Sequence, residues 1–447
     1  MNDASFAAEK PVSPDRAVDA LVAERMGVPL SALTRETVEA YQLEAFRRTL
    51  RYARENSDFY RTALADAEPE ASRTMEDIRR LPFTTEDDLA EHEWRFQCVG
   101  SSAVERNVTV PTTGTRGKRK RLSFSAEDQQ RAVDFIYRGF VTMRCAPGEK
   151  MLILMSGTSA GSIGDLVKRA MAPLAMDIDV FGSVTDIPAA YERLMAFRPG
   201  VVEAIPWHAA ALARYGARFG NPERAFIRSV NLSADVVPDA IVSRLERLWG
   251  CSVHRHYGST EMCIFGGVEC THHRGYHLRP CDILYEIPEP DENGLGEIVI
   301  TTLDREAMPL IRYRTGDIGR FEDEPCRCGC LLRRLWRVYG RESSRIPFGK
   351  TAVFLSDLAD ALYKTDAVID FDLAADRMRR LRFTVRTLPG ERAEAREIEE
   401  NVLAVPGVRE TVTAGEGELS FVFEETDSFP SGYNLKKTVA VLPSEGP

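Results

Sequence analysis

Apolar side chains recur at helical spacing in the first part of the chain. The clearest stretch is 34–65, where Val38, Phe46 and Leu50 belong to one face with a period near 3.6 residues. In residues 81–89, threonines precede a run of acidic residues, which is typical of a loop that leads into a helix. The pattern predicts a mostly helical segment over residues 1–95.

The pattern changes in the next part of the chain. An amphipathic stretch at 127–144 precedes a short apolar run at 150–155, and further apolar runs stand at 200–205 and 227–232. Helical and strand-like segments that alternate in this way predict an α/β domain with a largely parallel sheet.

Strand-like patterns dominate residues 251–341, where 296–302 is the clearest strand. Residues 346–447 have shorter alternating segments, with a turn predicted at Pro406-Gly407. The predicted fold class is therefore α/β. It has a large N-terminal domain with parallel-rich sheets and a β-rich subdomain, and a small C-terminal α+β domain.

The composition is ordinary for a soluble globular protein of two or more domains. The 447 residues are 44% hydrophobic and 28% charged, with a net charge of −10. This acidic balance argues against nucleic acid or a membrane as partner. The first ten residues are polar and no run of about 18 apolar residues exists, so we expect neither a secretory signal nor a spanning helix, and a cytoplasmic location.

Residues 110–120 combine hydroxyl, glycine and basic side chains. Such a loop can wrap a phosphate, because small residues let backbone N–H groups approach the oxygens and basic residues offset their charge. It is not a Walker-type loop, since Gly114 and Gly117 are too close together and Arg119 stands where a hydroxyl is required. The alternative is a solvated turn between two strands. The basic run is short and lacks interleaved aromatic residues, which disfavours a nucleic-acid site.

Two further segments, 256–261 and 309–317, carry candidate chemistry. The first reads His-Tyr-Gly-Ser-Thr-Glu and the second Pro-Leu-Ile-Arg-Tyr-Arg-Thr-Gly-Asp. Taken alone, the first could be a turn that caps a helix, with Ser259 or Thr260 as N-cap, and the second an exposed strand end.

Together, in this order and spacing, the three segments resemble the adenylate-forming superfamily of acyl-CoA synthetases, adenylation domains and luciferases. The closer resemblance is to the phenylacetate–CoA ligase branch, including coenzyme F390 synthetase-like proteins. It covers about residues 35–345 and weakens afterwards. The residues that carry it beyond the three segments are Gln42-Leu43, Phe59-Tyr60, Leu81-Pro82-Phe83-Thr84-Thr85, Gly296-Glu297 and Gly340-Arg341.

The resemblance implies an AMP-forming acid–thiol ligase. A carboxylic acid attacks the α-phosphate of ATP, and the acyl group then passes to CoA. Since two anions must meet, positive charge and hydrogen-bond donors are required. The resemblance implies a large adenylate-forming domain at 1–340, a hinge at 341–345 and a small mobile domain at 346–447.

The resemblance also assigns roles to individual residues. The residues that would bind the β,γ-phosphates are Thr112, Thr113, Gly114, Thr115, Gly117 and Lys120. The residues that would contact the adenine are Tyr257 and the segment Ser233, Ala234, Asp235. The residues that would line the α-phosphate are Gly258, Ser259 and Thr260. Asp317 would bind the ribose, Arg341 the ribose or a phosphate, and Glu261 a Mg²⁺ ion, which prefers carboxylate and phosphate oxygens. The residues expected to act in catalysis are Lys436, Glu261, Thr260 and Lys120.

The C-terminal part departs from the family pattern. The hinge position, normally Asp, is Ser343, and the position before the candidate adenylation lysine, Lys436, is Leu435 where the family has Gly. A solvated strand-end lysine is the alternative for Lys436. These departures affect the expected rotation and thioester formation more than adenylation.

Nine cysteines in a chain of this length suggest a metal site more than a disulfide scaffold, because several cluster in one region. Thiolates and imidazoles suit tetrahedral Zn²⁺. Related ligases of this branch often carry a similar set, so we predict a structural zinc site at Cys270, His277, Cys326 and Cys328. The alternatives are His272 or His273 as the histidine, Cys330 as a thiolate, or reduced cysteines without a metal.

The acid itself is less well defined by the sequence. A preference for aryl acids follows from the family only, as does a homodimer, and the candidate pocket residues are Phe135, Tyr137, Phe140, Trp207, His208 and Ala234. One alternative function is adenylation with another acceptor, namely an amine, a carrier-protein thiol or AMP transfer. The other is a homologue that binds adenylate or zinc without turnover.

Overall fold

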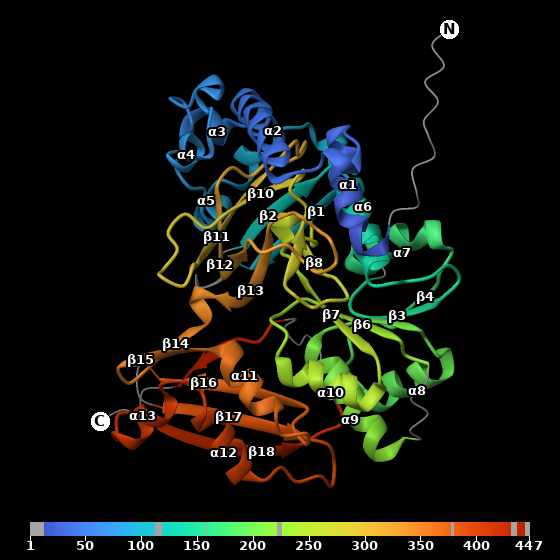
Figure 1. Ribbon diagram of the computed structural model, residues 1–447. Coiled ribbons are helices and arrows are strands. Elements are labelled where there is room, and N and C mark those ends of the chain that lie inside the picture. The colour runs from blue at the N-terminus through green and yellow to red at the C-terminus, as the bar shows by residue number, and fades with distance from the viewer. Residues whose placement is uncertain are drawn as a thin grey trace.

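The structure, a computed structural model, describes residues 13–111, 119–157, 159–220, 226–376, 380–430 and 436–442. The N-terminal helices lie at one end of the molecule and the C-terminal segment at the other, with a long mixed sheet between them (Figure 1). No helix in the described part of the chain is long and apolar enough to cross a membrane.

The predicted N-terminal helical segment centres on a long helix, α2 (Arg35–Asn56). Thr34 caps it, because its side chain accepts from the N–H of Thr37 while the Thr37 hydroxyl accepts from the N–H of Thr34. The helical stretch is divided at Ser57, which caps the next helix. The other helices of this segment are α1 (Ala17–Met26), α3 (Asp58–Ala63), α4 (Met75–Arg79) and α5 (Glu86–Glu91).

The first half of the central sheet is parallel, as the alternating pattern predicts. Its strands stand in the order β4-β3-β5-β6-β7. These strands are β3 (Lys150–Leu154), β4 (Asp177–Val180), β5 (Val201–Ala204), β6 (Ser229–Leu232) and β7 (Ser252–Tyr257). The helices that alternate with them are α6 (Ala126–Thr142), α7 (Ile163–Met171), α8 (Ile187–Phe197), α9 (Pro206–Phe219) and α10 (Asp239–Trp249).

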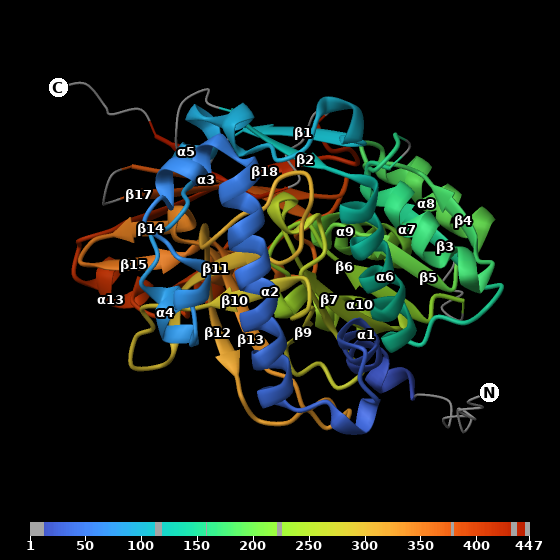
Figure 2. The ribbon, with the colours of Figure 1, turned by 90° about the horizontal axis from the view of Figure 1, so that it is seen from above.

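The second half of the sheet is antiparallel and continues from β7 in the order β8-β9-β13-β12-β11-β10. Seen from above, α2 lies over this half, while α1 lies beside α6 (Figure 2). The strands are β8 (Gly267–Glu269), β9 (Tyr276–Leu278), β10 (Ile283–Glu286), β11 (Leu295–Thr302), β12 (Tyr313–Glu322) and β13 (Arg334–Arg341). The predicted combination of a parallel-rich sheet and a β-rich part is confirmed.

A separate hairpin of β1 (Arg106–Pro111) and β2 (Arg119–Phe124) flanks the predicted phosphate loop. The loop itself, 112–118, lies outside the described residues. The assignments of Thr112, Thr113, Gly114, Thr115 and Gly117 therefore stay predictions, while Lys120 falls on β2.

The C-terminal segment is a small α+β unit, as predicted. A hairpin precedes a four-stranded sheet of order β18-β17-β16-β19. The strands are β14 (Arg345–Phe348), β15 (Thr351–Phe354), β16 (Asp370–Ala375), β17 (Arg380–Thr387), β18 (Glu418–Glu425) and β19 (Val439–Val441). The helices are α11 (Leu355–Tyr363), α12 (Ala395–Leu403) and α13 (Val408–Thr413).

Helix α10 packs directly against this C-terminal unit. Its Arg244 is 1% exposed and donates to the carbonyl oxygens of Tyr363, Thr365 and Val368 at 2.7, 2.9 and 2.7 Å. Asp360 of α11 in turn accepts from the N–H of Ala240 in α10 at 2.8 Å. Buried apolar residues of the parallel half and of the C-terminal unit form one continuous core. In this arrangement the two parts are firmly packed.

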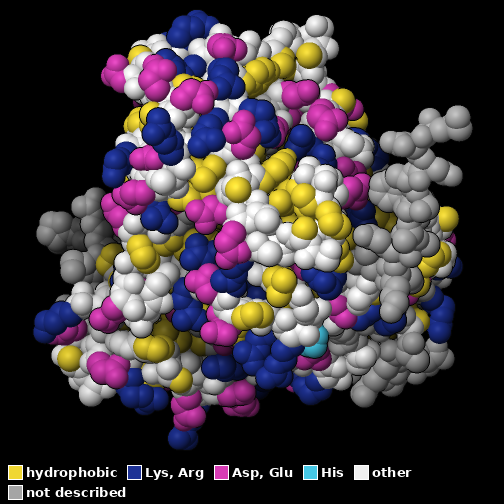
Figure 3. Space-filling model, turned by 45° about the horizontal axis from the view of Figure 1, so that its top comes forward, with side chains coloured by type: hydrophobic (Ala, Val, Ile, Leu, Met, Phe, Trp, Pro, Cys, Tyr) yellow, Lys and Arg dark blue, Asp and Glu magenta, His cyan; other side chains and the backbone are white. Residues whose placement is uncertain are grey.

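The surface carries charges of both signs. Figure 3 shows acidic and basic side chains interspersed over one face of the molecule. Exposed pairs such as Arg333–Asp323, at 2.8 Å, are screened by solvent and contribute little to stability.

Candidate active site

The two strand-end motifs and the C-terminal unit enclose one cavity of about 340 Å³. Its walls come from the ends of β7 and β13, the middle of β12, the segment after β6, helix α11 and the residues that follow Lys436. The predicted site residues among its walls are Ala234, Asp235, Tyr257, Gly258, Asp317, Arg341 and Lys436. A larger cavity of about 800 Å³, between α2 and the strands β10–β12, contains none of the residues predicted to bind nucleotide or metal.

Asp317 lies at the centre of the polar wall. The Tyr257 hydroxyl donates to its carboxylate at 3.0 Å, and the guanidinium of Arg341 lies 3.5 Å from the other carboxylate oxygen. The backbone explains this meeting, because Asp317 and Arg341 are paired residues of neighbouring strands. A carboxylate held in this way keeps lone pairs for further hydrogen bonds.

Gly258 is required by the backbone of the turn after β7. A Cβ atom there would lie 1.7 Å from the carbonyl oxygen of Ile264. Ser259 and Thr260 follow, and Thr260 begins a short 3-10 helix, Thr260–Met262, for which Ser259 is the N-cap residue without a side-chain cap. Ser259 therefore occupies the predicted N-cap position, but its side chain makes no capping hydrogen bond.

Glu261 is buried and paired with Lys120. The Lys120 ammonium lies 2.5 Å from Glu261 and 2.6 Å from Glu86, and it donates to the Tyr313 hydroxyl at 3.2 Å. Burial alone would raise the pKa of Glu261, but the charge and hydrogen bond of Lys120 hold it at about 2. Glu261 is thus an ionised carboxylate. Sequence reasoning missed Glu86 and Tyr313 as its neighbours.

The segment after β6 divides between core and cavity. Ser233 is 1% exposed and its hydroxyl donates to Glu203 at 2.8 Å, whereas Ala234, at φ +78°, lines the cavity. Asp235 accepts from the N–H groups of Val236 and Lys437 at 2.8 and 2.6 Å. Asp235 thereby joins the predicted adenine segment to the C-terminal strand region.

The two C-terminal lysines differ in their surroundings. Lys436 is exposed and lines the cavity. The ammonium of Lys437 is partly buried, donates to Asp370 and to the carbonyl of Phe371, and lies 5.1 Å from the Trp207 ring centre. Of the two, Lys436 has the more accessible position, which is compatible with its predicted role.

The pocket candidates separate into two groups. Trp207 and Ala234 line the cavity. Phe135 and Phe140 of α6 belong to the hydrophobic core, and the partly buried Tyr137 packs against that core. His208 is 2% exposed and contacts the Phe429 ring at 4.8 Å.

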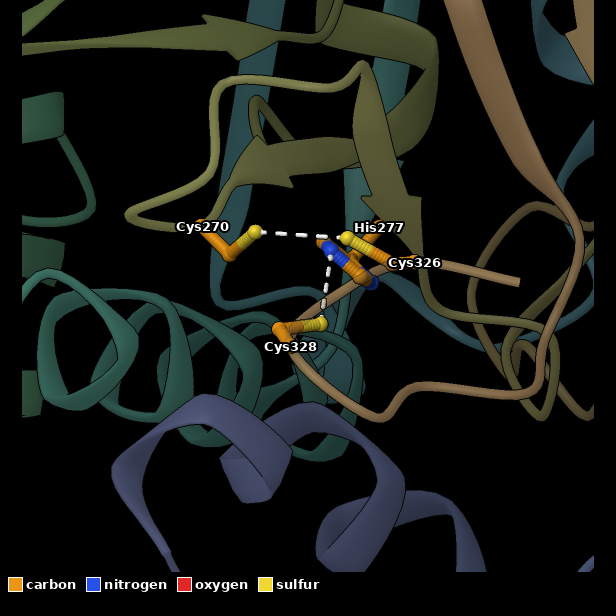
Figure 4. A group of neighbouring side chains, drawn as sticks. All are labelled: Cys270, His277, Cys326 and Cys328. Carbon is orange, nitrogen blue, oxygen red and sulfur yellow. Dashed lines mark hydrogen bonds between the residues drawn. The ribbon is translucent and has the colours of Figure 1, made fainter. Parts of the chain in front are cut away.

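The four predicted zinc ligands come together (Figure 4). Their ligand atoms all lie within 4.8 Å of one another, with Cys270 Sγ 3.7 Å from Cys326 Sγ, and Cys328 Sγ 3.6 Å from His277 Nε2. Two thiolates held about 2.3 Å from a tetrahedral ion stand at about this separation. Hydrogen bonds from Cys328 and His277 lower the pKa of the Cys270 thiol to about 6, against the opposing effect of burial.

The alternative ligands lie outside this group. Cys330 donates to Asp19 at 2.8 Å, and the His273 ring contacts Ser252 and Glu269. His272 is likewise not among the four residues that come together. The cluster is buried among apolar residues of α1, α2 and the β12–β13 loop, which suits a structural site. Zinc binding itself stays a prediction.

The chain resembles proteins of known activity, although no family model matches it. A phenylacetate–coenzyme A ligase of Thermus thermophilus is 31% identical over 325 residues, which are 70% of this chain and 72% of the relative.

Solved structures share the fold. A 2-hydroxyisobutyryl-CoA ligase in the postadenylation state, in complex with 2-HIB-AMP, matches with a TM-score of 0.75 at 18% identity, over 92% of this chain and 90% of that one. The same ligase in its thioesterification state, with 2-HIB-AMP and CoA, matches with a TM-score of 0.63 at 18% identity, over 90% of each chain.

Proposed function

This chain belongs to the phenylacetate–coenzyme A ligase family, the AMP-forming acid–CoA ligases, and on that premise we propose that it activates an aryl acid in the cavity between Tyr257, Asp317 and Arg341. The enzyme uses ATP to activate a carboxylic acid as acyl-AMP and passes the acyl group to CoA. The convergence of two motifs and the C-terminal unit on one cavity supports this location.

The nucleotide would bind with its ribose on Asp317. The lone pairs left after the Tyr257 hydrogen bond would accept from ribose hydroxyls, and Arg341 would add positive charge beside them. Ala234 and Asp235 would face the adenine, beside the Tyr257 ring.

Adenylation needs positive charge around the phosphates. The acid's carboxylate oxygen bonds to the α-phosphorus while the bond to pyrophosphate breaks, so negative charge passes to the leaving group. Glu261, buried and ionised, fits as the residue that would hold Mg²⁺, which would supply charge to the phosphate oxygens. Lys120 pairs with the same carboxylate and Lys436 lines the cavity, which supports a role for both ammonium groups in adenylation.

Thioester formation would follow after the C-terminal unit moves. We propose residues 1–340 and 346–447 as the two parts, with the hinge at 341–345 and Ser343 in place of the usual Asp. The better match to the postadenylation state supports assigning this arrangement to the first half-reaction. A homodimer is retained as a proposal from the family alone, which a mass measurement in solution would test.

The zinc site completes the proposal. Zn²⁺ bound by Cys270, His277, Cys326 and Cys328 would be structural, since four protein ligands fill a tetrahedral shell. It would fix the β12–β13 loop to β9 and to the segment between β8 and β9, at the end of the β12–β13 pair that is remote from Asp317 and Arg341.

The test is pyrophosphate release over a panel of aryl, aliphatic and amino acids, with and without CoA. We expect release that depends on the acid, and an acyl-CoA product when CoA is present. An amide or an AMP-transfer product would show that the acceptor is a molecule other than CoA. ATP binding without acid-dependent release from any panel member would contradict the proposal.

A further inference from the structure

Four polar side chains gather on one face of the parallel sheet, at its carboxyl end. Glu203 of β5 is paired with Asn231 of β6, which is paired with His254 of β7. Side chains two positions apart share a face of a strand, so Ser233 and His256 stand one step beyond this row. We call Glu203, Asn231, Ser233 and His256 the polar cluster.

The polar cluster is unusual because it is buried. Its members are 0, 3, 1 and 6% exposed, in the order given. Glu203 accepts from the Asn231 amide at 2.6 Å and from the Ser233 hydroxyl at 2.8 Å. Both donors are neutral, and burial raises the pKa of Glu203 to about 7. A carboxylate kept in the sheet interior costs stability, which indicates a use.

His256 connects the polar cluster to the cavity. It lines the cavity next to Tyr257 and its ring packs on Phe265 at 4.2 Å. Neither ring nitrogen has a hydrogen-bond partner among the described residues. Burial lowers the pKa of His256 to about 3, so the ring is neutral and offers one donor and one acceptor. Leaving both unsatisfied is costly, and a ligand group that bonds to the ring removes this cost.

The polar cluster is rich in acceptors. Glu203 takes up a hydrogen from Asn231 and the hydrogen of Ser233, so the Ser233 oxygen is left with lone pairs only. The neutral His256 ring adds an acceptor nitrogen. Of the polar cluster, His256 lines the cavity, whereas Glu203, Asn231 and Ser233 are buried beside it in the sheet. A group that reaches the His256 ring from the cavity therefore meets a region rich in acceptors and is favoured when it brings its own hydrogens.

We propose that the polar cluster reads the tail of the acid and that the preferred substrate is a carboxylic acid whose tail carries a hydrogen-bond donor, an amino or a hydroxyl group. The inference rests on the proposed function, since it assigns the acid to this cavity. Trp207 supplies an apolar wall of the cavity, Phe265 packs on the His256 ring, and His256 makes the direct contact. Glu203 is a positioning residue that acts through Ser233.

The experiment compares three acids of nearly equal size: 4-hydroxyphenylacetate, 4-aminophenylacetate and 4-methylphenylacetate. ATP–pyrophosphate exchange gives kcat/KM for each, and calorimetry in the presence of AMP gives binding without turnover. A donor-bearing acid should exceed the methyl compound by about 10-fold or more, because a site built for a hydrogen bond rejects the analogue that lacks it. Which of the two donors is preferred identifies the amino or the hydroxyl class.

His256→Leu should reduce this preference about 10-fold, while the methyl compound keeps its rate. His254→Leu is the matched control, because it removes a histidine from the same strand that does not line the cavity. Glu203→Gln should also weaken the preference and serves as the second variant if His256→Leu fails to fold.

Equal binding of all three acids, or an unchanged preference in a folded His256→Leu, would overturn the inference. Failure of exchange with every acid would instead contradict the proposed function, and the calorimetric preference would still decide the role of the polar cluster.

Discussion

At the scale of residues, the carboxylate of Asp317 is held by two side chains from other strands, Tyr257 and Arg341. Tyr257, Asp317 and Arg341 were predicted from short motifs, and they line one cavity. The Lys120–Glu261 pair and its neighbours Glu86 and Tyr313 were not predicted, because they come from four separate segments. Pairings of this kind depend on tertiary packing, which no local pattern contains.

Asp317→Ala should weaken nucleotide binding. The change removes charge-assisted hydrogen bonds worth about 1.5–3 kcal/mol, which corresponds to a loss of roughly 10-fold to 150-fold in affinity. Calorimetric titration with AMP measures it. Asp323→Ala, at an exposed pair, is the control and should bind normally. Unchanged affinity in Asp317→Ala would remove the ribose assignment.

Lys120→Met should destabilise the fold by about 3–5 kcal/mol near neutral pH, because it leaves Glu261 buried without its cation. The pKa of Glu261 is about 2 in the folded protein, below its ordinary 4.5. Its ionisation therefore stabilises the fold above about pH 4.5, and this stabilisation is lost as the pH falls toward 2.

The difference between wild type and Lys120→Met should accordingly shrink on acidification, as measured by denaturant unfolding at several pH values. Arg333→Met, which breaks an exposed pair, should change stability by less than about 1 kcal/mol. A gap that stays constant down to pH 3 would show that Glu261 is not held ionised by Lys120.

At the scale of elements, periodicity closely predicted α6, β3, β5 and β6 of the parallel half, and β11 in the other half. The prediction at 150–155 corresponds to β3 and that at 296–302 to β11. The polar cluster escaped detection, since a Glu in an apolar run such as Val201–Ala204 looks like an irregularity until the register of neighbouring strands is known.

Cys328→Ser should lower bound zinc from about one equivalent to nearly none and reduce the melting temperature, because four ligands form a tetrahedral set. Metal analysis after dialysis and a thermal melt measure both effects. Cys330→Ser is the matched control on the same loop and should retain zinc, since Cys330 bonds to Asp19 instead. A metal-free wild-type protein would contradict the site.

At the scale of the molecule, the α/β class and the α+β character of the C-terminal unit follow from the sequence, but the contact between the two parts does not. Arg244 lies on an ordinary amphipathic helix, and only the assembled structure shows it buried against three carbonyl groups of the C-terminal unit. Burial of a charged side chain at an interface is fixed by the packing of distant segments.

Arg244→Met should slow ATP–pyrophosphate exchange about 10-fold or more, because each buried carbonyl left without a donor costs about 1–3 kcal/mol and Lys436 loses its fixed approach to the cavity. Thiolysis of added acyl-AMP by CoA should be less affected, since it is proposed to follow movement of this unit. Arg247→Met, at an exposed pair with Asp366, is the control. Equal loss in both half-reactions would contradict a role specific to this arrangement.

Asp235 constrains how such an enzyme can diversify. Its carboxylate lines the cavity proposed for the nucleotide and also accepts from the backbone N–H of Lys437, next to Lys436, which lines the same cavity. A substitution of Asp235 that alters recognition of the adenine base would therefore also release the backbone near Lys437. Related enzymes should therefore rarely vary at position 235 and should vary more often in the polar cluster, which is proposed to contact the end of the acid away from its carboxylate. Substitutions there could change the acid that is accepted without changing how ATP is bound.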